Sequence, residues 1–595
     1  MSTRIRNLLL AVLALTAACD RRPRDATPPP ARDLLAGAWS AEQARPLLAT
    51  TRTIRLAPDL SALTPGERAA VAKLLEVGAI MQTLYEDQLH PQAAAARAQL
   101  AERGPAHLRT LYRLFEGPIG NTLDNKQVPF LAVEPPQPGK NVYPWRMTRA
   151  ELDGYLEAHP AEREALIASR TVVRRAADAS RDLAALDRHP VLDALHPGLR
   201  DRLERVGRGA DRAALYALPY SVAWADRIVR AHQLLAEAAD AVEADDPELA
   251  GYLRNRGRDL LSDDYESGDA AWVTGRFHHL NAEIGSYESY DDELHGSKTF
   301  FSLSLLAVRT AETDQLRTAL GGLQSFEDAL PYAHHKRVRE NIPVGVYDII
   351  ADFGQARGAN TASILPNEAY LARRYGRTII LRANIMRSPE LAGDAELVWR
   401  AAVAPAHAAE LTADGEFHRT LWHEVGHYLG VDTTGDGREL ASALAEDADL
   451  LEEMKADLVS LFVAEALRAR GYYDDAALRS VEAAGVLRVL QNNRPRRDQP
   501  YRTMQLMQWN FFLEKGLLRF DSGALVIDYA RYHETITALL ERVLDLQNRG
   551  DKAGADTFID DYTRWDEALH GAVAARIRAT QKYRFANLYY AALGE

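Results

Sequence analysis

The chain has 595 residues, of which 47% are hydrophobic and 26% are charged, which is the composition of a globular protein with two or more lobes. Its formal net charge of -13 argues against nucleic-acid binding, which needs a basic surface. The single cysteine, Cys19, excludes an internal disulfide and a cysteine-based zinc site.

The first residues have the pattern of an export signal. Arg4 and Arg6 precede an apolar run at 8–15, and small residues stand just before Cys19. The run is too short to span a bilayer. We expect residues 1–19 to be a lipoprotein-type signal peptide, with a plain secretory signal as the alternative, and residues 20–45 to be a disordered tether. A lipidated Cys19 would then anchor the chain to a membrane of the bacterial cell envelope, facing the periplasm.

The residue composition and the spacing of apolar residues change twice along the chain. From about residue 40 to 260, apolar residues recur at helical spacing and predict amphipathic helices. Between about 265 and 400, turn formers become frequent, and β-rich runs at 345–350 and 378–381 predict strands. From about 400 onward the spacing is helical again. The sequence therefore predicts an α+β protein in which helix predominates.

A candidate metal site lies in the second helical region. His423-Glu-Val-Gly-His427 is an HExxH motif, and two histidines four residues apart share one face of a helix, so both imidazoles can reach one ion. Glu424 would project beside the metal, where it can deprotonate a water. Apolar residues at helical spacing around the motif predict the helix itself, with a stop at Gly430. The alternative is a helix in which the two histidines have no role in metal binding.

A third ligand is predicted on the following helix, which we expect from residue 441 to about 470. Glu453 and Asp457 are four residues apart and share a face, so one can bind the metal while the other accepts a hydrogen bond from a ligating histidine. A charged solvent-facing surface is the alternative. Two imidazoles, one carboxylate and an open position suit a catalytic Zn²⁺, one per chain. We expect Glu453 to be the ligand, with Asp457 and Glu452 orienting the histidines.

These two segments together resemble the paired signature of the dipeptidyl peptidase III family of zinc metallopeptidases. The chain carries the five-residue HExxH form that some bacterial members have, followed by Glu452-Glu-Met-Lys-Ala-Asp457, with Met454 where Cys is common. Upstream, residues 284–291 resemble the family's "GxxESYxD" strand, and residues 365–367 resemble an "IPN" segment. With further matches at 507–511 and 514–516, the resemblance covers about 280–550.

The resemblance implies further roles. Glu288 and Asn367 would hold the free amino group of the substrate, and Tyr290 would stabilise the tetrahedral intermediate together with the zinc. It also implies a cleft between two lobes. We expect the lower lobe, with helices and a small β-barrel, at 46–310 and 346–395, and the helical zinc-binding lobe at 311–345 and 396–595.

The implied activity is the removal of dipeptides from the N-terminus of short peptides. One family histidine that assists the intermediate, expected within 502–506, is absent from this sequence. Three alternatives therefore stand beside the dipeptidyl peptidase: a zinc aminopeptidase or endopeptidase, a catalytically impaired zinc-containing lipoprotein that binds peptides, and a scaffold that docks partners through its N-terminal helices.

Overall fold

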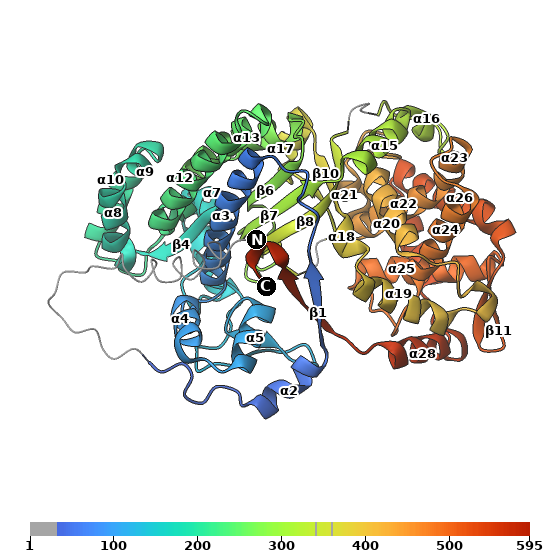
Figure 1. The fold of residues 1–595 in the computed structure, drawn as a ribbon, viewed down its shortest axis with the longest axis horizontal. Helices are drawn as coiled ribbons and strands as arrows, with labels where there is room; N and C mark the ends of the chain where they lie inside the picture. The colour runs from blue at the N-terminus through green and yellow to red at the C-terminus, as the bar shows by residue number, and fades with distance from the viewer. Residues whose placement is uncertain (1–31, 339–341, 359–360) are drawn as a thin grey trace.

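The structure, a computed structural model, describes residues 32–338, 342–358 and 361–595 (Figure 1). The predicted signal peptide, Cys19 and the first part of the tether lie outside these residues. None of the described helices combines the length and the apolar character that crossing a bilayer requires. The envelope anchor remains a prediction.

The molecule has two lobes, each around its own hydrophobic core (Figure 1). We call them the sheet lobe, built mainly from the first half of the chain, and the helical lobe, built mainly from the second half. A small third cluster of buried residues, between Leu34 and Val133, extends the sheet lobe. The predicted class, α+β with helix predominating, is confirmed by the elements of the described residues.

The helices of the sheet lobe are α2 Ala41–Ala49, α3 Pro65–Leu89, α4 Ala93–Arg103, α5 Ala106–Phe115, α6 Arg149–Ala158, α7 Arg163–Ile167, α8 Ala179–Arg188, α9 Pro190–Leu195, α10 Leu199–Arg208, α11 Tyr220–Ala223, α12 Ala225–Val242, α13 Pro247–Ser262 and α14 Glu266–Thr274. Those that follow are α15 Thr310–Leu320, α16 Leu323–Glu327, α17 Ala369–Tyr375, α18 Ala383–Met386, α19 Pro389–Ala402, α20 Ala413–Gly426, α21 Leu440–Leu444, α22 Ala448–Phe462, α23 Ala464–Ala469, α24 Asp475–Val489, α25 Pro500–Glu514, α26 Tyr532–Arg549, α27 Lys552–Tyr562 and α28 Ala572–Thr580.

A five-stranded mixed sheet lies where the lobes meet, in the order β6-β7-β8-β10-β9. Its strands are β6 Leu280–Ser286, β7 Phe301–Val308, β8 Val344–Gly354, β9 Ala362–Leu365 and β10 Thr378–Arg382. The predicted runs at 345–350 and 378–381 lie within β8 and β10. The pairings of the described strands run from one edge at β6 to the other at β9, so the small β-barrel stays a prediction.

The sheet belongs to both cores because its side chains alternate between its faces. In β10, Ile380 packs into the core of the sheet lobe, whereas Ile379 and Leu381 pack into the core of the helical lobe. β10 pairs with β8 in parallel and with β9 antiparallel. This double-sided burial explains why the strands read as continuous apolar runs, and it fixes the edge strand β9 beside helix α20.

The ends of the described chain meet in the sheet lobe. β1 (Thr51–Leu56) pairs in parallel with β13 (Phe585–Tyr590), in register from Thr51 with Phe585 to Leu56 with Tyr590. The chain therefore leaves the helical lobe after α28 and returns to the sheet lobe (Figure 1). Three two-stranded ladders complete the fold: β2 (Ile119–Asn121) with β3 (Gln127–Pro129), β4 (Thr171–Arg175) with β5 (Leu215–Pro219), and β11 (Leu518–Asp521) with β12 (Ala524–Ile527).

Two expected elements differ in detail. The single helix predicted for 441–470 is three helices, α21, α22 and α23. Ala445, with a positive φ of 50°, ends α21, and Val463 separates α22 from α23. The segment expected as a "GxxESYxD" strand is a strand only as far as Ser286, where β6 ends. Glu288 and Tyr290 therefore lie in the loop that follows the strand.

Candidate metal centre

Helix α20 presents the HExxH motif. The hydroxyl of Thr412 accepts a hydrogen bond from the backbone N–H of Gly415 and caps the helix N-terminus. Phe417, Leu421, Trp422 and Val425 are buried and anchor one side of the helix in the core of the helical lobe. The helix ends at Gly426, earlier than the predicted stop at Gly430, so that His427 follows its last residue in a helical backbone conformation.

The neighbouring helix α22 packs very closely against this end of α20. A Cβ added at Gly426 would lie 2.8 Å from the carbonyl oxygen of Ala456 and 3.1 Å from its Cα. Only a glycine fits this contact between two backbones. The close approach brings the acidic residues of α22 against the histidines of α20.

Three side chains converge on one point. Nε2 of His423 lies 3.3 Å from Oε2 of Glu453, and Nε2 of His427 lies 4.0 Å from the same oxygen. One ligand atom from each residue lies within 4.8 Å of the other two, an arrangement that can hold one metal ion. Two imidazole nitrogens and a carboxylate oxygen are a donor set that fits Zn²⁺ with a position left open.

A second carboxylate holds each imidazole from behind. Nδ1 of His423 lies 2.8 Å from Oδ1 of Asp457, and Nδ1 of His427 lies 3.1 Å from Oε1 of Glu452. Each ring is therefore oriented with Nε2 toward Glu453, as carboxylate–histidine–metal arrangements require. The three acids of α22 take the positions expected from the sequence: Glu453 at the centre, with Glu452 and Asp457 behind the rings.

The electrostatics of the cluster favour positive charge at its centre. Burial by itself lowers the pKa of His423, but the adjacent Asp457, Glu453 and Glu424 carboxylates outweigh it and raise that pKa to about 9. Burial raises the pKa of Glu452, yet Lys455 and His427 bring it down to about 2. A cluster that stabilises a proton on a buried imidazole also suits a divalent cation in the same place.

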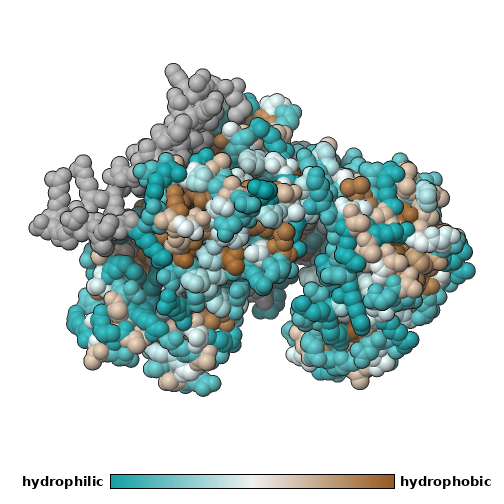
Figure 2. All heavy atoms as spheres, turned by 90° about the horizontal axis from the view of Figure 1, so that it is seen from below, coloured by the Kyte–Doolittle hydropathy of each residue, from teal (hydrophilic) through white to brown (hydrophobic). Residues whose placement is uncertain are grey.

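A cavity of about 700 Å³ opens in front of the cluster and is lined by both lobes. Glu424 is half-buried and lines it beside the histidines. The sheet lobe contributes Glu288, Tyr290 and Asn367 from the loops after β6 and β9. The surface view also shows a hollow between the two lobes (Figure 2).

The two residues expected to hold a substrate amino group touch each other. Nδ2 of Asn367 donates a hydrogen bond of 3.0 Å to Oε1 of Glu288. Burial raises the pKa of Glu288, while this hydrogen bond lowers it, with a net upward shift. Tyr290 is 81% exposed and faces the cavity. The structure thus gathers every predicted site residue other than Cys19 around one cleft.

Several residues around the cluster were not predicted from the sequence. The hydroxyl of Tyr501, from α25, donates a hydrogen bond of 3.0 Å to Oε1 of Glu453. The guanidinium groups of Arg419 and Arg488 lie 2.9 and 3.2 Å from the two oxygens of Asp457. Lys455 is fully buried and lies 2.7 Å from Glu452. The position of Lys455 in the Glu-Glu-Met-Lys-Ala-Asp run was a usable signal, and so was that of Arg419, one turn before His423 in α20. Tyr501 and Arg488 come from two other helices, α25 and α24.

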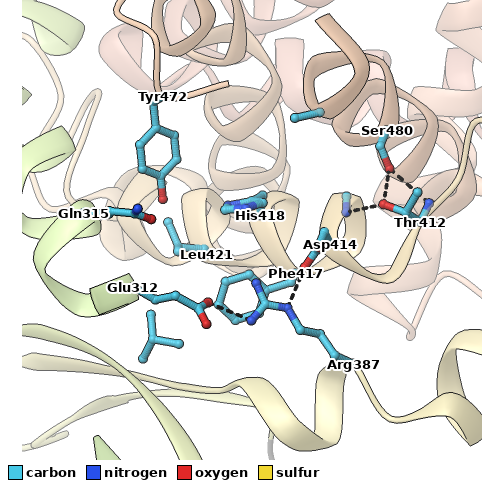
Figure 3. A pocket seen from close by; sticks show the side chains of 13 residues that line it. Glu312, Gln315, Arg387, Thr412, Asp414, Phe417, His418, Leu421, Tyr472 and Ser480 are labelled. Atoms are coloured by element: carbon cyan, nitrogen blue, oxygen red, sulfur yellow. Dashed lines mark hydrogen bonds and ion pairs between the residues drawn. The ribbon is translucent and has the colours of Figure 1, made fainter. Parts of the chain in front are cut away.

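Helix α20 borders a second cavity, of about 310 Å³, on its opposite face (Figure 3). Arg387 lies 2.7 Å from Glu312 and 2.6 Å from Asp414, and it stacks on the ring of Phe417. These residues tie α20 to α15 and to the turn after α18. Asp414, Phe417 and His418 point away from the metal cluster because they lie about half a turn from His423 around the helix.

The fold is shared with solved peptidase structures. Comparison with protein-family models found no match. The structure of DPP III from Caldithrix abyssi superposes with a TM-score of 0.78 at 24% identity, covering 92% of this chain and 98% of that one. Dipeptidyl-peptidase III from Corallococcus sp. strain EGB gives a TM-score of 0.71 at 22% identity, covering 94% and 98%.

A plant sequence is also similar. "Nudix hydrolase 3" of Arabidopsis thaliana is 24% identical over 434 residues, which are 71% of this chain and 54% of that protein. The chain spans about half the length of this curated relative. The comparisons and the geometry agree on the architecture: this chain has the two-lobed fold of the dipeptidyl-peptidase III structures.

Proposed function

We propose that this protein is a zinc-dependent dipeptidyl peptidase that releases dipeptides from the N-terminus of short peptides. The observation that carries the proposal is the convergence of His423, His427 and Glu453, with a second carboxylate behind each imidazole. The likeness in fold to two dipeptidyl-peptidase III structures supports the same reaction class.

The three ligands would hold one Zn²⁺, which when bound makes water acidic enough to ionise near neutral pH and polarises a carbonyl oxygen. Glu424 takes the proton of the attacking water and later delivers it to the leaving amine. Asp457 and Glu452 keep the two imidazoles in the orientation in which Nε2 faces the ion.

The opposite wall of the cleft would bind the peptide. The substrate's N-terminal ammonium is placed against the Glu288 carboxylate, which Asn367 holds in position. Tyr290 donates a hydrogen bond to the scissile carbonyl oxygen as negative charge develops on it. Anchoring the ammonium at a fixed distance from Glu424 selects the second peptide bond, which is the feature that separates a dipeptidyl peptidase from a single-residue aminopeptidase.

The test compares arylamide substrates of different length. Wild-type protein should hydrolyse a dipeptidyl-arylamide far faster than a single-residue arylamide. Because the proton transfer depends on its carboxylate, Glu424→Gln should retain the metal and lose about 10²–10⁴-fold in kcat. Glu465→Gln, an exposed residue of α23 in the same lobe, is the control and should match wild type.

Other results would favour the alternatives. Faster release of single residues would identify an aminopeptidase, and cleavage only within longer peptides would identify an endopeptidase. A zinc-loaded protein that binds peptides and shows no hydrolysis, unaffected by Glu424→Gln, would identify a peptide-binding protein. Attachment to the cell envelope through Cys19 belongs to the same proposal and is checked by metabolic labelling with a radioactive fatty acid, which Cys19→Ser should abolish.

A further inference from the structure

Tyr501 is the second residue of helix α25 and lies in the cleft. Its side chain is 51% exposed, and its hydroxyl donates a 3.0 Å hydrogen bond to Oε1 of Glu453. The same residue lines the cavity that contains the two histidines. The hydroxyl of Tyr501 therefore contacts a proposed metal ligand, and its side chain is not buried in the hydrophobic core.

The two oxygens of Glu453 have different surroundings. Oε2 faces the Nε2 atoms of His423 and His427, at 3.3 and 4.0 Å. Oε1 instead accepts the hydrogen bond of Tyr501. A carboxylate can bind a metal through one oxygen or through both, and catalytic zinc sites combine three protein ligands with one open position. The hydrogen bond to Oε1 therefore favours binding through Oε2 alone over binding through both oxygens.

We propose that Tyr501 is a positioning residue that restricts Glu453 to binding the ion through Oε2 alone. With Oε1 engaged, the carboxylate takes up one coordination position and leaves the next one free for water and substrate. The inference rests on the proposed function, because it concerns the metal that function requires.

The location of Tyr501 suits this role. Tyr501 and Glu453 both belong to the helical lobe, so the hydrogen bond persists whether the cleft is wide or narrow. Tyr290, the other exposed phenol in the cavity, belongs to the sheet lobe and faces the substrate. A carboxylate oxygen can only accept a hydrogen bond, so the Tyr501 hydroxyl is the donor in this contact.

The experiment uses Tyr501→Phe in the full-length protein, with Tyr562→Phe as a matched control. Tyr562, at the end of α27, donates a 2.7 Å hydrogen bond to the Glu514 carboxylate of α25, outside the cleft. Zinc affinity is measured on metal-free protein by competition with a chromogenic chelator. Tyr501→Phe should bind zinc about 10-fold more weakly, whereas Tyr562→Phe should match wild type. Thermal melts of the metal-free proteins check that all three are folded.

Cobalt substitution reports the coordination directly. Wild-type protein loaded with Co²⁺ should give the intense visible absorption of a four-coordinate site. Tyr501→Phe should give the weaker spectrum of higher coordination, because Oε1 is released. An unchanged affinity together with an unchanged spectrum would overturn the role of Tyr501 while leaving the proposed function intact. A wild-type protein that binds no zinc would overturn both.

Discussion

At the residue scale, His423 shows how a metal ligand is held. Its Nε2 faces Glu453, its Nδ1 faces Asp457, and Asp457 is itself fixed by Arg419 and Arg488. Burial raises the pKa of Asp457, but Arg488, His423 and Arg419 together hold that pKa well below its ordinary value. Asp457 is therefore a permanent anion that couples the metal cluster to two arginines.

This arrangement predicts the effect of Asp457→Asn. The amide keeps the shape but removes the charge, which leaves the largely buried guanidinium of Arg419 without its counter-ion. We expect a loss of about 3 kcal/mol in the free energy of unfolding and a 10- to 100-fold loss in zinc affinity. Urea unfolding of metal-free protein and chelator competition measure the two effects separately.

The control for this substitution is Asp475→Asn. Asp475 also pairs with an arginine, Arg468, but its side chain is 82% exposed. An exposed ion pair contributes little to stability, so both measurements should stay at the wild-type values. Equal losses in the two variants would show that burial of Asp457 is not what makes it important.

Much of the cluster could be predicted at this scale. Helical periodicity alone places His423 and His427 on one face of α20, and Glu453 and Asp457 on one face of α22. It does not say which of the two acids meets Nε2, because that depends on how two helices approach each other. Tyr501 was missed for a related reason: it reaches Glu453 from a third helix, and no spacing in the sequence links the two residues.

At the element scale, the site depends on the distance between α20 and α22. Gly426 touches the backbone of Ala456 directly, so the two helices are as close as their backbones allow. The sequence predicted a helix stop at Gly430 and indicated no role for Gly426. Gly430, with a φ of 81°, does lie in a left-handed turn, but Gly426 is needed for packing.

Gly426→Ala tests this packing. The new methyl group would overlap the carbonyl oxygen of Ala456 and force the helices apart, which should cost about 1–3 kcal/mol of folding free energy. Since the histidines and Glu453 sit on opposite sides of the contact, zinc affinity should fall as well. Denaturant unfolding and zinc titration measure both.

Gly393→Ala provides the matched control. Gly393 lies inside helix α19, and a Cβ at this position meets nothing within 4 Å. Alanine is the better helix former, so this variant should be as stable as wild type or more stable, by up to about 1 kcal/mol. A Gly426→Ala protein that behaves like Gly393→Ala would contradict the close-contact explanation.

At the scale of the whole molecule, the strand β13 returns the chain from the helical lobe to the sheet lobe. Chain length and the family resemblance predicted two lobes, and local patterns predicted helices and two strands. None of these could pair β1 with β13, because the partners are more than 500 residues apart in sequence. The terminal segment also contacts the sheet lobe through an ion pair between Arg113 and Glu595, with nitrogen–oxygen distances of 2.5 and 2.6 Å. Residues 585–590 therefore lie in the sheet lobe, inside the range 396–595 that the sequence predicted for the helical lobe.

Removing residues 585–595 should weaken the sheet lobe and spare the metal cluster. Leu588 and Tyr590 would no longer fill the core of that lobe, and β1 would lose its only partner among the described strands. We expect a lower melting temperature and faster proteolysis near β1, with zinc stoichiometry unchanged. Loss of zinc in the truncated protein would show that the two lobes do not hold their structure independently.

The most direct measurement of the central claim is the metal content of purified protein beside its dipeptide-release activity. We predict one zinc per chain in wild type, and loss of both zinc and activity in His427→Ala and in Glu453→Ala. A wild-type chain that is active without bound metal, or a Glu453→Ala variant that keeps a full zinc and full activity, would contradict the assignment of this cluster as the catalytic centre.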